Sequence, residues 1–217
     1  MKYDREHLKF VFIGAGSSVF TMRLIGDILK EDSILSGELV LVDIDPVVLE
    51  ESYTSAKELL QYAKRNFSIR KEIDFRRAID NADFVFLTIA TGAYPRWQKD
   101  IEVCTPFGVL QSVGDTIGPG GIIRALRTIP VVLEIAHEME RRCPNAYLIN
   151  YANPEGALCL AIQKYTRVRS FGLCHGTPDT AALLAKRVFG VEPSRFSFRA
   201  AGINHLTWFT DMSIDGE

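Results

Sequence analysis

The order of apolar and polar positions along the chain predicts alternating strands and helices. Short continuous apolar runs, typical of strands buried on both faces, occur at 9–13, 39–42, 83–88, 146–150 and 168–173. A helical pattern follows each run, at 17–30, from Pro46 through Leu60, and at 120–142, 154–164 and 177–188. The apolar face expected for 120–142 includes Ile122 and Leu126. A weaker run at 67–73 is expected to form an edge strand.

Strands separated by helical segments indicate an α/β protein with a doubly wound parallel sheet. After Phe196 the pattern changes, because 196–201 and 206–214 resemble strands with no helix between them. We expect these to be antiparallel. The sequence therefore predicts one domain at 1–195 and the beginning of a second, α+β domain at 196–217.

Composition and charge favour a small-molecule function. The chain has 217 residues, of which 47% are hydrophobic and 24% charged, so it can bury a substantial core. A formal net charge of −2 gives no reason to expect nucleic acid or an anionic membrane as a partner. The charged N-terminal segment does not resemble a secretory signal, and no apolar run is long enough to span a membrane. We expect a cytoplasmic protein with free thiols.

A glycine turn follows the first predicted strand. Gly14-Ala-Gly16-Ser17 supplies the first two glycines of the pattern G-x-G-x-x-G, and Val19 stands where the third would be. Such glycines let backbone amides approach a pyrophosphate at the start of a helix. An acidic residue, Asp43, ends the next strand, where it would hold a ribose hydroxyl. This arrangement predicts a dinucleotide site at the N-terminal end of the chain.

The acid favours NAD over NADP, because a carboxylate would repel a 2′-phosphate. Asp45 is a close competitor for the same role. The alternative is that Gly14 and Gly16 only form a tight turn and that Asp43 only caps the next segment, as happens in α/β proteins that bind no nucleotide.

Polar loops follow the later strands as well. In a parallel sheet, ligands bind at the carboxyl ends of the strands, so these loops are the place to look for a site. They lie at 88–95, 150–155, 174–177 and 202–205, and a separate glycine-rich loop lies at 114–121.

Cys174 and His205 form a possible ligand pair for a divalent transition metal. Neighbours in an extended segment point to opposite sides, so His175 would contact substrate instead. Asn153 lies in an Asn-Pro loop similar to that of lactate and malate dehydrogenases, where the amide is near nicotinamide and substrate. The alternatives are a buried Cys174, a His205 that bonds to a strand, and an ordinary Asn-Pro turn.

Together these motifs resemble the family 4 glycoside hydrolases, which are NAD- and metal-dependent relatives of the lactate/malate dehydrogenase fold. The resemblance covers almost the full chain, and its most specific part is the unusual stretch from Gly114 to Pro130. It also includes 13–17, 42–46, 150–154, 172–176 and 201–205. It implies a Rossmann domain at 1–195, followed by the start of a substrate domain.

The resemblance implies specific roles. Cys174 and His205 would bind Mn²⁺, Asn153 and His175 would contact the sugar, and Asp115 would lie near the reacting carbons. The residues expected to contact NAD are Gly14, Gly16, Ser17, Asp43, Thr88 and Asn150. Because His175 follows the cysteine, the chain is similar to the branch that acts on unphosphorylated α-glycosides. The block ending at Arg124 is most similar to α-galactosidases and α-galacturonidases, and an α-glucoside is a further option.

The implied chemistry is a cycle in which NAD takes a hydride from the sugar C3, the C2 proton is lost, the C1 group is eliminated, water adds and the hydride returns. Members of the family resemble about twice this length, and their downstream half supplies a tyrosine base. We therefore expect a homo-oligomer or a piece of a larger polypeptide. Two alternatives are a malate/lactate-type dehydrogenase with His175 as acid and base, and a non-catalytic NAD-binding module.

Overall fold

The computed structural model describes residues 7–17, 20–111, 113–203 and 206–217. The chain divides into two compact units, Met1–Gly172 and Leu173–Glu217. No helix within the described ranges is both long enough and apolar enough to cross a bilayer.

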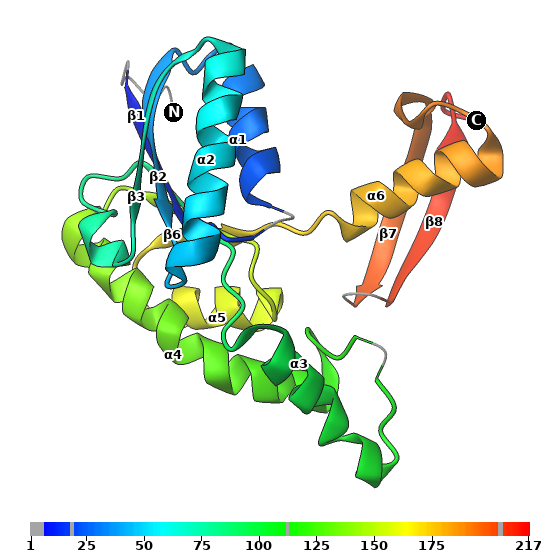
Figure 1. Ribbon diagram of the computed structural model, residues 1–217. Helices are drawn as coiled ribbons and strands as arrows, with labels where there is room; N and C mark the ends of the chain where they lie inside the picture. The colour runs from blue at the N-terminus through cyan, green and yellow to red at the C-terminus, as the bar shows by residue number, and fades with distance from the viewer. Residues whose placement is uncertain (1–6, 18–19, 112, 204–205) are drawn as a thin grey trace. The chain divides into compact units, whose positions relative to one another are not determined.

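The first unit is built around a six-stranded parallel sheet (Figure 1). The strands run in the order β3-β2-β1-β4-β5-β6, the order of the doubly wound dinucleotide-binding fold. Their bounds are β1 Leu8–Ile13, β2 Ser36–Val42, β3 Asn66–Glu72, β4 Phe84–Leu87, β5 Tyr147–Asn150 and β6 Arg169–Gly172. The predicted parallel α/β sheet is therefore confirmed, and its order reverses between β1 and β4.

Helices cover both faces of this sheet. On one face Phe10 and Phe12 pack in a cluster with residues of α1 and α2, whereas Val11 and Ile13 pack on the other face with residues of α4 and α5. This division follows from the alternation of side chains along a strand. The helices and short turns are α1 Thr21–Lys30, α2 Pro46–Ala63, η1 Phe75–Arg77, α3 Ala93–Glu102, η2 Thr105–Phe107, α4 Gly118–Arg142 and α5 Glu155–Tyr165.

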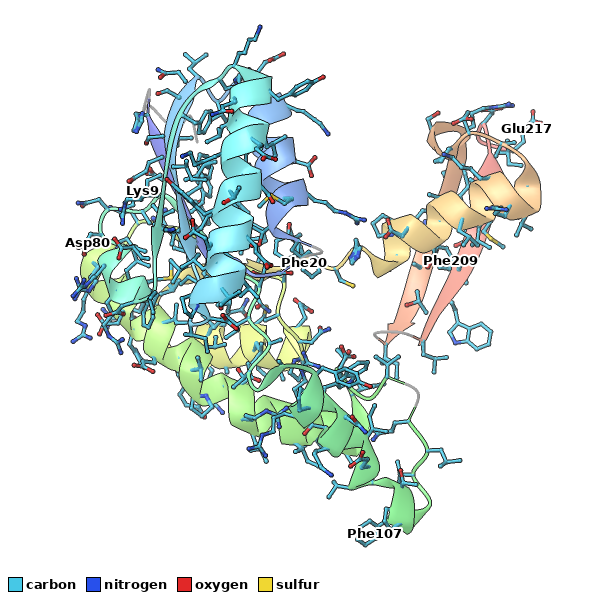
Figure 2. All side chains as sticks on the ribbon, in the orientation of Figure 1. Lys9, Phe20, Asp80, Phe107, Phe209 and Glu217 are labelled. Carbon is cyan, nitrogen blue, oxygen red and sulfur yellow. The ribbon has the colours of Figure 1, made fainter. Side chains whose placement is uncertain are left out.

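Hydrogen bonds of Lys9 connect segments at the N-terminal ends of the strands. The Lys9 ammonium donates to the carbonyl of Asp80 at 2.7 Å (Figure 2). The Lys9 amide donates to the Asp83 carboxylate at 2.9 Å. Burial lowers the pKa of Lys9, and the nearby Glu38 opposes this effect. These contacts stabilise the N-terminal ends of the strands, whereas the polar loops extend from the carboxyl ends.

The buried face of α4 differs from the predicted one in its first turns. Ile122 and Leu126 belong to the predicted apolar pattern, but 62% and 71% of their surface is exposed. Gly120 and Gly121 face the protein instead, because a Cβ atom at these positions would lie 2.6 Å from Gly114 O and from Thr116 C, respectively. The close approach of a loop thus sets the orientation of the helix here.

The second unit is a helix packed on an antiparallel hairpin. It contains α6 Gly176–Leu183, a π-helical turn η3 Leu184–Phe189, η4 Pro193–Arg195, β7 Phe196–Ile203 and β8 Leu206–Ile214. Ala181 and Ala185 form a small core with Phe196, and Phe209 of β8 packs against it (Figure 2). In this structure α6 and η3 pack with the hairpin in one compact unit, Leu173–Glu217, and the domain boundary at 195/196 stays a prediction.

All four cysteines are free thiols, as predicted. Cys104, Cys143 and Cys159 are buried, whereas Cys174 is exposed. The alternative of Cys174 as a buried apolar side chain is therefore wrong.

Candidate functional site

The turn between β1 and α1 requires its two glycines. Gly14 has φ +90°, and a Cβ there would lie 2.8 Å from the backbone of Thr88 and Ile89. A Cβ at Gly16 would lie 2.6 Å from Val48 Cγ2 and 2.9 Å from an oxygen of Asp43. Only a residue without a side chain fits these positions, so the glycines are required by the close packing of the turn against β4 and α2.

The residues after the turn begin α1. The Ser17 amide donates to Gly14 O at 3.1 Å, and the Ser17 hydroxyl accepts from the Phe20 amide at 3.3 Å. Phe20 is the N-cap residue of α1, and its own side chain makes no capping hydrogen bond. Val19, at the third glycine position, lies outside the described residues. The described amides of Ser17 and Phe20 are therefore bonded within the turn, and contact of this loop with a pyrophosphate stays a prediction.

The two candidate acids at the end of β2 have different surroundings. One oxygen of Asp43 accepts the Gly16 amide at 2.8 Å, and the other accepts the Asp45 amide at 3.0 Å. Asp45 instead caps α2, accepting the Val47 amide at 2.9 Å. Asp43 is therefore the acid that contacts the glycine turn, which favours it over Asp45 for the ribose. Its bonds to backbone amides also fit the simpler capping role.

Thr88 and Asn150, both buried, shape the neighbouring loops. The Thr88 hydroxyl donates to Gly14 O at 2.7 Å and so ties the end of β4 to the glycine turn. The Asn150 amide bonds to both the amide and the carbonyl of Ala152, at 3.0 and 3.1 Å. Their contact with NAD stays a prediction.

Asp115 and Asn153, which are 38 positions apart, meet in the structure. Asn153 Nδ2 donates to Asp115 Oδ2 at 2.8 Å, and the Thr116 hydroxyl donates to Asp115 Oδ1 at 2.9 Å. Asp115 is buried, and Asn153, which precedes a cis-proline, is half-buried. The residue expected near the reacting carbons and the residue expected to hold the sugar thus share one hydrogen bond.

Arg124, for which no role is predicted from the sequence, contacts both members of this pair. Its Nε donates to the carbonyl of Asn153 at 3.3 Å, and its Nη1 lies 3.9 Å from Asp115 Oδ2. Burial lowers the pKa of Arg124, whereas the charges of Asp115 and Asp100 oppose that shift. The only sequence signal was its place in the unusual block from Gly114 to Pro130.

Close backbone packing explains the glycines of the 114–121 loop. The Gln111 side-chain carbonyl accepts the Gly120 amide at 3.2 Å. The Trp97 indole donates to Val113 O at 2.6 Å, so α3 also supports this loop. These contacts hold the segment on which Asp115 lies.

Cys174 and His175 both lie in the second unit. The exposed Cys174 sulfur accepts the Gly176 amide at 3.4 Å. His175 is the N-cap of α6, and its Nε2 lies 3.9 Å from an Asp179 oxygen. Within the described ranges, no three His, Cys, Asp or Glu side chains gather to hold a metal ion. His205, the predicted second ligand, lies outside the described residues.

The sequence model of the family 4 glycosyl hydrolases matches residues 9–189. The chain belongs to this family. Among curated relatives of this family 4 chain, an α-galactosidase of Bacillus subtilis is 38% identical over 209 residues, and an α-galacturonidase of Thermoanaerobacter italicus is 39% identical over 221 residues. Each alignment covers 96% of this chain but only 48% and 47% of those proteins. The chain thus spans about half the length of the curated relatives it matches.

Solved structures agree on the fold of the family 4 chain. A 6-phospho-α-glucosidase from gut microorganisms, solved in complex with NAD and Mn²⁺, gives a TM-score of 0.83 at 24% identity, covering 97% of this chain and 48% of that one. Lactate dehydrogenase from Eimeria maxima gives 0.66 at 17% identity, covering 97% and 58%. The prediction of a Rossmann sheet like that of lactate dehydrogenase is therefore confirmed.

Proposed function

We propose that this chain forms the nucleotide- and metal-binding part of an NAD- and Mn²⁺-dependent glycosidase that acts on unphosphorylated α-glycosides. The observation that carries the proposal is the hydrogen bond between Asp115 and Asn153, in a chain that belongs to family 4. The bond unites the acid expected at the reacting carbons with the amide expected to hold the sugar.

The glycine turn fits a dinucleotide. Gly14 and Gly16 let the turn pack closely against the end of β4 and against Asp43, which lies at the end of β2. Gly16, Ser17 and the start of α1 would hold the pyrophosphate, Asp43 the ribose, and Thr88 and Asn150 the nicotinamide side. NAD, when bound, would supply a reversible oxidant for a sugar hydroxyl. The related 6-phospho-α-glucosidase, solved with NAD, supports this assignment.

A thiolate from Cys174 and an imidazole from His205 would leave the other coordination positions of Mn²⁺ to oxygen donors, which this ion prefers. The exposure of Cys174 suits a ligand that receives its metal from solvent. The ion, when bound, would supply a Lewis acid for neighbouring sugar oxygens.

The side chains of the site would divide the work on the sugar. The Asn153 amide donates to Asp115, and its carbonyl oxygen is an acceptor suited to a sugar hydroxyl. Asp115 would place a carboxylate near the reacting carbons, and the exposed His175 would donate to the sugar. Each of these side chains would contribute by orienting the bound substrate.

The substrate is proposed to be an α-galactoside or an α-galacturonide. The presence of His175 after Cys174 supports an unphosphorylated sugar, and two similar relatives are an α-galactosidase and an α-galacturonidase. An α-glucoside is a second option, because an α-glucosidase of Erwinia rhapontici is 31% identical over 205 residues.

The test is hydrolysis of p-nitrophenyl α-galactoside and α-galacturonide with NAD, Mn²⁺ and a reductant, and with each omitted in turn. We expect turnover only with NAD and the metal, and a loss of turnover in EDTA. Asn153→Ala should lower kcat/KM about 100-fold by removing a substrate hydrogen bond, whereas Asn145→Ala, at an exposed turn, should not. Turnover without metal, or net NADH formation from a hydroxy acid, would contradict the proposal.

The metal ligand can be tested without turnover. Mn²⁺ should protect the exposed Cys174 from iodoacetamide, because alkylation requires the sulfur to be accessible. An equal rate of Cys174 alkylation with and without Mn²⁺ would exclude this cysteine as a ligand.

A further inference from the structure

We infer that Arg124 is a positioning residue for the Asp115–Asn153 pair, an inference that rests on the proposed function. Arg124 lies in the second turn of α4 and reaches the loop that follows β5. Its guanidinium contacts the backbone of one member of the pair and faces the carboxylate of the other. It therefore joins two segments that are distant in sequence.

The Asn153 amide and the Arg124 guanidinium both approach the same oxygen of Asp115. Asp115 Oδ2 accepts from Asn153 Nδ2 at 2.8 Å and lies 3.9 Å from Arg124 Nη1. Arg124 Nε at the same time donates to the main-chain carbonyl of Asn153 at 3.3 Å. The guanidinium thus fixes the Asn153 backbone while its charge acts on the oxygen that the Asn153 amide binds. The direction of that amide depends on both contacts.

Burial strengthens this interaction. The Arg124 and Asp115 side chains are only 14% and 12% exposed, so water screens their charges far less than on the surface. The charge of a buried carboxylate is stabilised by a nearby cation and by hydrogen-bond donors. Arg124 supplies the cation, and Thr116 and Asn153 supply donors.

The charges of Asp100 and Arg127 also favour Asp115 as the partner of Arg124. Asp100 is also close enough to act on Arg124 electrostatically, but it already binds Arg127 through both oxygens, at 2.9 and 2.6 Å. Arg127 repels Arg124 and so disfavours its movement toward Asp100. This arrangement directs the Arg124 charge to Asp115.

An arginine suits the role better than a lysine. Its planar group offers donors in fixed directions, so one side chain can serve a carbonyl on one loop and a carboxylate on another. A lysine would keep the charge but not both directions. Replacement by lysine should therefore retain part of the function, and replacement by methionine, which is similar in length and uncharged, should retain none of it.

The test compares Arg124→Met and Arg124→Lys with the control Arg141→Met, a replacement of the same kind at an exposed position of the same helix. With the α-galactoside, Arg124→Met should lower kcat about 30-fold or more with less than about a threefold change in KM, because orientation of bound substrate is lost. Arg124→Lys should recover at least about threefold of that loss, and Arg141→Met should match wild type.

Two further measurements distinguish a positioning role of Arg124 from a general structural role. The Kd for NAD, from calorimetry, should stay within about twofold of wild type in each variant, because Arg124 bonds to the Asn153 loop, whereas Gly16 and Asp43 of the glycine turn bond to each other. In a crystal structure of Arg124→Met, the separation of Asn153 Nδ2 and Asp115 Oδ2 should lengthen from 2.8 Å beyond hydrogen-bonding distance.

The outcomes separate this inference from the proposed function. Wild-type kinetics in both Arg124 variants, or an unchanged Asn153–Asp115 separation, would overturn the positioning role. A parallel loss of NAD affinity would show a general structural role and would also overturn it. If the wild-type chain neither binds NAD nor hydrolyses an α-glycoside, the proposed function fails, and the crystallographic separation still decides whether Arg124 positions the pair.

Discussion

Asp43 links the glycine turn to the start of α2 through one carboxylate. It accepts the amides of Gly16 and Asp45, so both its position and its orientation are set before any ligand binds. A carboxylate has about four acceptor positions, so these two bonds leave capacity for a ribose hydroxyl. The residue is thus preorganised for the proposed role and also stabilises the turn.

Replacing Asp43 by alanine should weaken NAD binding at least about tenfold, or about 1.4 kcal/mol, because a charge-assisted bond to the ribose is lost. Asp45→Ala is the matched control. It should lower the free energy of unfolding by about 1 kcal/mol through loss of the α2 cap and leave the NAD affinity unchanged. Calorimetric titration and thermal unfolding measure the two effects, and equal affinities in both variants would show that the ribose is held elsewhere.

Gly14 is the second residue whose replacement gives a defined outcome. Alanine there would adopt φ +90° and place its Cβ 2.8 Å from the β4 backbone, so Gly14→Ala should destabilise the chain by about 2 kcal/mol or more. Gly26, inside α1, has no atom within 4 Å of a Cβ, and Gly26→Ala should stabilise it by about 0.5–1 kcal/mol. Denaturant unfolding measures both, and a neutral Gly14→Ala would contradict the close approach.

At the level of elements, α3 and α4 are joined by a buried ion pair. Asp100 of α3 is 2% exposed and binds Arg127 of α4 through both oxygens, and Arg127 Nε also donates to Thr91 O at 3.0 Å. Hydrogen bonding to Asp100 raises the pKa of Arg127. This pair therefore connects the segment after β4 to the helix that carries Arg124.

Asp100→Ala should cost about 3 kcal/mol of stability, because it leaves the Arg127 charge partly buried without its carboxylate. Glu102→Ala, which removes an exposed pair with Lys99 on the same helix, should have no measurable effect on stability. Urea unfolding of the two variants provides the comparison. Equal midpoints would mean that the buried pair does not anchor α3.

The pattern of apolar residues predicts elements better than it predicts their faces. Strands and helices occur where the sequence places them, because buried parallel strands and helical periodicity are local signals. The face of α4 was misjudged at Ile122 and Leu126, since the packing of Gly120 and Gly121 on a loop is not visible in a periodic pattern. No role is predicted for Arg124 for the same reason, because its bond to the Asn153 carbonyl joins residues that are 29 positions apart.

At the scale of the whole molecule, the strand order creates the site. The strands β1, β4 and β5 are parallel neighbours in the sheet, which places their carboxyl ends side by side, so distant loops converge without any local signal for the contact. The Asp115–Asn153 bond is such a contact. Sequence could identify both residues, whereas the choice between Asp43 and Asp45 required the geometry of the turn.

Two buried thiols should make the stability of the fold depend on alkaline pH. Burial raises the pKa of Cys143 and Cys159 to about 11, whereas a thiol in an unfolded chain has a pKa near 8.5, so the folded state holds these protons more tightly. The contribution is fully present below about pH 8.5 and is lost as the pH rises toward about 11, because only the unfolded chain can then release the protons easily. Urea unfolding between pH 8 and 11 should show a shallower decline of stability in the Cys143→Ala, Cys159→Ala double variant than in wild type, since its lysines and tyrosines are unchanged. Parallel declines in the two proteins would contradict the role of these thiols.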